Sequence, residues 1–85
     1  MQNIWQNNFR ITVVGLGYVG LPLAIALARK FLVTGFDTDQ QRVSELRSGE
    51  DRTGEVSSEE LVGSSIKFVG DLKIAAPSDL FVIAV

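Results

Sequence analysis

The chain has 85 residues, a formal net charge of −2, and neither cysteine nor histidine. This composition excludes disulfides and a thiolate nucleophile, predicts no metal site, and argues against nucleic-acid binding, because no basic run is present to neutralise phosphates. Apolar runs are too short to span a membrane, and the polar start, MQNIWQNN, does not have the pattern of a secretory signal. We therefore expect a cytoplasmic protein without membrane association.

Residues 1–8 show no periodicity and are expected to form an N-terminal tail, so the domain is predicted to span residues 9–85. The first strand is predicted at residues 11–14, a β-branched run typical of a strand covered on both faces. An apolar helix follows from Tyr18 to about Lys30. Because it has no polar face, we expect it to be buried on more than one side.

A G-x-G-x-x-G sequence, Gly15-Leu16-Gly17-Tyr18-Val19-Gly20, joins this strand to this helix. Gly15 permits the tight turn, Gly17 lets a pyrophosphate approach the backbone, and Gly20 lets the helix lie close to the strand. The start of the helix also presents free N–H groups and a partial positive charge to an anion. For Tyr18 and Val19 we expect mainly packing around the turn, with incidental cofactor contact.

The second strand, residues 31–36, ends in Asp37, which lies 17 residues after Gly20. A carboxylate there can accept hydrogen bonds from both hydroxyls of an adenosine ribose and would repel a 2′-phosphate, so the sequence favours NAD over NADP. Asp37 could alternatively cap the next helix. Thr38 or Asp39 could provide that cap equally well.

A second helix is predicted within TDQQRVSELRSG, with Val43 and Leu46 on its inner face and Gly49 as its stop. Arg42 has two interpretations. Its guanidinium either lies near the adenine or adenosine ribose, or is an exposed charge opposite Glu45.

The rest of the chain begins with a predicted loop at 50–56, followed by a helix that starts with a capping box of Ser57 and Glu60. A strand is predicted at 66–69, a short helix capped by Asp71 at 72–76, and an apolar strand at 80–85. Right-handed crossovers then give an α/β fold of the Rossmann type, a parallel sheet in the order 3-2-1-4 with helices on both faces. A wholly apolar last strand belongs inside such a sheet. We therefore expect an N-terminal fragment of a longer enzyme.

Three segments, ITVVGLGYVGLPLAIALAR, VTGFDTDQQRV and LFVIAV, resemble the amino end of the UDP-glucose/GDP-mannose dehydrogenase family. The sequence G-L-G-Y-V-G-L-P and the spacing from Asp37 to Arg42 carry most of this resemblance. The segment GEDRTGEVSSEEL resembles the branch that acts on UDP-N-acetylhexosamines in the synthesis of Vi-type and O-antigen polysaccharides.

The resemblance implies oxidation of the C6 alcohol of a UDP-sugar to a carboxylate, with two NAD+ and a thioester on a cysteine. The catalytic groups of the family lie in segments beyond Val85, so this chain is expected to bind cofactor and to catalyse nothing alone. The implied cofactor contacts are the turn from Gly15 to Gly20, Asp37, Arg42 near the adenosine ribose, and Val85 at the head of the next loop. A homodimer of the full-length enzyme is also implied.

Two other functions fit the fingerprint. One is another dehydrogenase that uses NAD(P) or FAD, such as a hydroxyacid or 6-phosphogluconate type. The other is a non-enzymatic module that senses a nucleotide.

Overall fold

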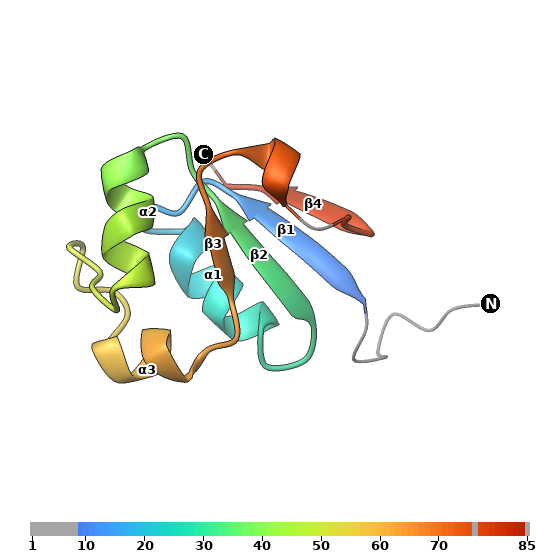
Figure 1. Ribbon diagram of the computed structural model, residues 1–85. Helices are drawn as coiled ribbons and strands as arrows, with labels where there is room; N and C mark the ends of the chain where they lie inside the picture. The colour runs from blue at the N-terminus through green and yellow to red at the C-terminus, as the bar shows by residue number, and fades with distance from the viewer. Residues whose placement is uncertain (1–8, 76, 85) are drawn as a thin grey trace.

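Four parallel strands form one sheet in the order β3-β2-β1-β4 in the computed structural model of the chain, which describes residues 9–75 and 77–84 (Figure 1). The strands are β1 (Arg10–Val14), β2 (Leu32–Phe36), β3 (Lys67–Val69) and β4 (Leu80–Ile83). This confirms the predicted parallel sheet and its order. The expected tail at residues 1–8 and Val85 lie outside the described residues.

Three α-helices and one 3-10 turn connect the strands: α1 (Gly20–Leu27), α2 (Gln40–Arg47), α3 (Ser58–Gly63) and η1 (Leu72–Ile74). Helix α1 is shorter than predicted at both ends. At its carboxyl end the backbone hydrogen bonds change to the 3-10 pattern, in which the N–H groups of Arg29 and Lys30 donate to carbonyl groups three residues earlier. No helix in the described part of the chain has the length and apolar character needed to cross a membrane.

Helices α2 and α3 begin at capping residues that the sequence offers, and a glycine follows the end of α2. Asp39 is the N-cap of α2 and accepts the backbone N–H groups of Gln41 and Arg42. Ser57 and Glu60 form the predicted capping box at α3, and Gly49 has a positive φ of 89° after α2. These caps satisfy backbone groups that have no partner inside a helix.

One hydrophobic core lies between the sheet and the α-helices. Val13 of β1 is fully buried, and its neighbours in the sheet register are Gly35 and Val82. The predicted inner face of α2 is confirmed, since Val43 and Leu46 are buried. The rest of this cluster comes from the strands, the helices and the loops between them: Ile11, Leu16, Leu21, Ala24, Ile25, Val33, Val56, Leu61 and Phe68.

The segment that contains η1 lies over the opposite face of the sheet (Figure 1). Thr12 is buried there, and its hydroxyl hydrogen-bonds the hydroxyl of Ser78. Asp71 caps η1 by accepting the backbone N–H of Lys73. The predicted coverage of both faces is thus unequal, with α-helices on one side and one 3-10 turn on the other.

Strand β4 lies at the edge of the sheet, and among the described residues it pairs with β1 alone. Leu80, Phe81 and Ile83 are 47%, 54% and 62% exposed. This terminal position agrees with the predicted order, in which the fourth strand is the last in the sheet. The expectation that α1 is buried on more than one side is wrong within the described residues, because Leu21 and Ala24 are buried but Ala26 is exposed.

Two glycines bring α1 against the end of β1. Gly15 has a φ of 99°, a backbone angle that residues other than glycine rarely adopt. A Cβ atom on Gly20 would overlap the carbonyl oxygen of Gly15, a backbone atom that cannot rotate away. The close approach of the helix to the strand thus requires glycine at position 20.

Replacing Gly20 with alanine should therefore lower the free energy of unfolding by at least about 2 kcal/mol, because the turn has to move to accommodate the methyl group. Urea unfolding followed by circular dichroism measures this change. Gly63→Ala is the matched control, since a Cβ atom there meets no atom within 4 Å in the part of the chain that the structure describes. Equal unfolding midpoints for both variants would contradict the close contact.

Candidate functional site

The candidate site lies at the carboxyl ends of β1 and β2, where the glycine turn leaves the sheet. The backbone N–H of Gly15 donates to the carbonyl of Phe36 at 2.8 Å, which joins the turn to the end of β2. A Cβ atom on Gly17 would meet no atom of the described residues within 4 Å. The middle of the turn therefore has open space at the position where the fingerprint places a pyrophosphate.

Leu16 contributes to this turn through its backbone. Its side chain is fully buried, and it occupies space left by Gly35, where a Cβ atom would approach the two Leu16 methyl groups to 3.0 and 3.2 Å. The side chain is therefore unable to reach a ligand in the turn. The predicted cofactor contact of Leu16 is restricted to its peptide groups.

Asp37 follows β2 and lies beside the turn. Its Oδ2 accepts the backbone N–H of Leu16 at 2.9 Å, and its Oδ1 accepts the backbone N–H of Asp39 at 2.9 Å. The cap of α2 is Asp39, so Asp37 does not have the alternative role of helix cap. Each carboxylate oxygen accepts one of these bonds and retains a further acceptor position, which fits the two hydroxyls of a ribose.

Arg42 is 5% exposed, which excludes the interpretation as an exposed charge. Its Nε and Nη2 both donate to the carbonyl oxygen of Leu16, at 2.8 and 2.6 Å. Its Nη1 donates to Oδ1 of Asp51 at 2.8 Å. Glu45, the partner considered for Arg42, instead accepts a bond from Arg52 at 2.8 Å.

Asp51 was not identified from the sequence, where its segment reads as a connecting loop. Its side chain has no exposed surface, and it accepts bonds from Arg42, from the backbone N–H and hydroxyl of Thr53, and from the backbone N–H of Val56. Burial raises its pKa, but the hydrogen bonds from the Thr53 hydroxyl, from Arg42 and from the backbone outweigh this and lower the pKa to about 2. The only local signal was Asp followed two residues later by Thr, a pattern typical of side chain to backbone turns.

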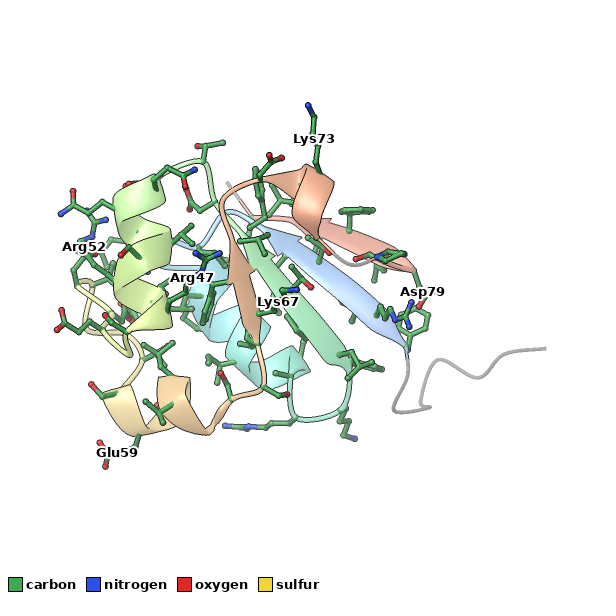
Figure 2. All side chains as sticks on the ribbon, in the orientation of Figure 1. Arg47, Arg52, Glu59, Lys67, Lys73 and Asp79 are labelled. Carbon is green, nitrogen blue, oxygen red and sulfur yellow. The ribbon has the colours of Figure 1, made fainter. Side chains whose placement is uncertain are left out.

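Tyr18 and Val19 are 68% and 70% exposed, so the expectation that they pack around the turn is wrong. They lie in the last part of the turn, directly before α1 begins at Gly20, where no described segment covers them. Arg52, also missed from the sequence, is half exposed beside α2 and pairs with Glu45 and Asp39 (Figure 2).

Two hollows meet at the turn and share Leu16, Gly17 and Asp37. One has a volume of about 230 Å³ and is otherwise lined by Tyr18, Asp39, Arg42, Arg52 and Thr53. The other has a volume of about 400 Å³ and is otherwise lined by Val14, Gly15, Phe36, Thr38 and Ala84. They lie at the carboxyl ends of the strands, where β1 has β2 on one side and β4 on the other, the place where open α/β sheets bind ligands.

The chemistry of these residues fits a dinucleotide. Open space at Gly17 accommodates phosphate, and Asp37 provides free acceptor positions for a ribose diol. Among residues 9–75 and 77–84, no group of three or more acidic side chains is placed to hold a metal ion.

Residues 9–85 match the model of the UDP-glucose/GDP-mannose dehydrogenase family, NAD binding domain. The chain is 41% identical over 78 residues to Protein CapL of Staphylococcus aureus. It is 43% identical over 79 residues to UDP-N-acetyl-D-glucosamine 6-dehydrogenase of Pseudomonas aeruginosa. These matches cover 92% of this chain but only 18% and 19% of the two relatives.

Among solved structures, the chain is similar to the UDP-D-ManNAc dehydrogenase from Pyrococcus horikoshii. The TM-score is 0.80 at 30% sequence identity, over 91% of this chain and 20% of that one. Sequence and structure thus agree with the resemblance inferred from the glycine turn. The chain belongs to the UDP-glucose/GDP-mannose dehydrogenase family, and residues 9–85 correspond to its NAD-binding domain.

Proposed function

We propose that this chain is the cofactor-binding part of an enzyme that oxidises the C6 alcohol of a UDP-N-acetylhexosamine to the uronate, for polysaccharide synthesis. The observation that carries the proposal is the open glycine turn beside Asp37, in a chain whose relatives include UDP-N-acetyl-D-glucosamine 6-dehydrogenase. Conversion of the alcohol to a carboxylate removes four electrons and takes up one water, so it requires two NAD+. When bound, NAD+ supplies the hydride acceptor.

In this proposal the chain binds and orients the cofactor. The turn from Gly15 to Gly20 holds the pyrophosphate through backbone N–H groups, and Asp37 accepts the adenosine ribose hydroxyls. Arg42 lies beside the same moiety, because it lines the hollow that Asp37 also lines. Tyr18, Val19, Val85 and the backbone of Leu16 are the further contacts that we propose for the bound cofactor.

Catalytic groups are not assigned to this chain, and we propose that it is inactive alone. The UDP-sugar contacts, a homodimer and a cytoplasmic location belong to the proposal for the full-length enzyme. We expect the full-length enzyme of this proposal to form two NADH for each uronate. The assay incubates it with NAD+ and either UDP-N-acetylglucosamine or UDP-N-acetylmannosamine. Absence of NADH with these and with other UDP-sugars would contradict the proposed reaction.

Gly17→Ala should separate cofactor binding from folding. The added methyl group has space within the domain, so the free energy of unfolding should stay unchanged or rise by up to about 1 kcal/mol. The same group occupies the space of the pyrophosphate, so calorimetric titration should show NAD+ binding at least about tenfold weaker. Full NAD+ affinity in this variant would mean that the turn has a structural role only.

Asp37→Asn should weaken NAD+ binding by about tenfold or more, because an acceptor that carries charge is lost at the ribose. Binding of NADP+ should weaken less, so the preference for NAD+ should fall. Distortion of the turn alone would weaken both cofactors equally and leave that ratio unchanged.

Asp79→Asn is the matched control for Asp37→Asn. Asp79 also accepts a backbone N–H, from Arg10 at 2.9 Å, but it precedes β4, at the amino ends of the strands and so at the opposite end from the glycine turn (Figure 2). Its substitution should leave both cofactor affinities unchanged. An equal loss in the two variants would remove the special role of Asp37.

A further inference from the structure

Both polar groups of the Leu16 backbone bond to side chains. Its N–H donates to Asp37, and its carbonyl oxygen accepts two N–H groups from the one guanidinium of Arg42. A fork of two bonds to one oxygen fixes the direction of that carbonyl more closely than a single bond does. The orientation of the Leu16–Gly17 peptide is thus determined by α2, a separate element of the fold.

The planarity of the peptide carries this constraint to the centre of the turn. The described residues contain no cis peptide bond, so the Gly17 N–H points opposite to the Leu16 carbonyl. Arg42 holds that carbonyl on its own side, which directs the Gly17 N–H away from Arg42. Gly17 borders both hollows of the site. The direction of its N–H therefore affects how the turn meets a pyrophosphate.

Arg42 in turn depends on Asp51. The guanidinium is buried, and a buried cation without a counter-charge is strongly unfavourable. Asp51 supplies that charge at 2.8 Å, with a side chain that has no exposed surface. Three further bonds, two from Thr53 and one from Val56, hold the carboxylate in place.

We propose that Asp51 is a positioning residue for NAD binding, which acts through Arg42 on the Leu16–Gly17 peptide. It touches no cofactor itself. The inference rests on the proposed binding of NAD at this turn. It gives the loop from Asp51 to Val56 a role in cofactor affinity that its position outside the fingerprint does not indicate.

The test compares Asp51→Asn with the unchanged chain. Asparagine keeps the size and an acceptor oxygen but removes the charge that fixes Arg42. We expect NAD+ affinity, measured by calorimetry, to fall about tenfold. In the cofactor-free protein, the Leu16 carbonyl carbon and Gly17 amide nitrogen should also change their NMR shifts. Unchanged NAD+ affinity in Asp51→Asn would overturn the inference.

A double variant tests whether Asp51 acts through Arg42. If it does, adding Asp51→Asn to Arg42→Met should cause no further loss of NAD+ affinity. If the fold-losses of NAD+ affinity in the two single variants multiply in the double variant, Asp51 does not act through Arg42. Should Asp51→Asn not fold, Arg42→Lys serves instead, because lysine keeps a positive charge opposite Asp51 but has no fork for the Leu16 carbonyl. It should show the same NMR changes and a similar loss, and full affinity would overturn the inference.

Glu60→Gln is the matched control for general destabilisation. Glu60 is also a carboxylate that accepts a backbone N–H in a capping structure, but it lies at the start of α3, outside the site. The Glu60→Gln variant should be less stable but should keep its NAD+ affinity. A loss of affinity equal to that of Asp51→Asn would count against the inference. Failure of the unchanged chain to bind NAD+ would defeat the proposed function as well, whereas binding that is insensitive to Asp51 would defeat this inference alone.

Discussion

The peptide groups of Leu16 are the point on which the cofactor end of this domain depends. Asp37 accepts the N–H, and Arg42 donates twice to the carbonyl. Through these bonds the glycine turn, the end of β2, α2 and the loop that carries Asp51 form one connected unit. A turn rich in glycine would otherwise have many conformations available. Side chains from outside the turn thus restrict it to one shape before any ligand arrives, which reduces the entropy cost of binding.

Steric constraints in the turn complement this network. The buried Leu16 side chain lies in the space that Gly35 leaves on β2, and Gly20 lies against the backbone of Gly15. Gly17 differs from them, because no atom of the described residues lies within 4 Å of the position that its Cβ atom would take. The same motif therefore contains glycines required for packing and one whose open space is available to a ligand. Such a division is expected where a rigid scaffold presents backbone groups to an anion.

Features encoded by local patterns were predictable from the sequence. The capping box of Ser57 and Glu60, the positive φ of Gly49, the strand order and the position of Asp37 all follow from short-range chemistry or from the handedness of crossovers. The pairing of Arg42 with Asp51 did not follow, because tertiary packing decides which charges are buried and the loop that carries Asp51 has no period. The exposure of Tyr18 and of β4 likewise depends on what covers them, which periodicity does not specify.

The central claim is that NAD binds at the glycine turn beside Asp37. It is tested most directly by titrating the ¹⁵N-labelled chain with NAD+ and, separately, with NADP+, while following the backbone amide signals. We predict saturable shifts concentrated at Gly15 to Gly20, Asp37 and Arg42, with NAD+ binding more tightly than NADP+. A folded sample whose signals at these residues do not respond to NAD+, or respond equally to both cofactors, would contradict the claim.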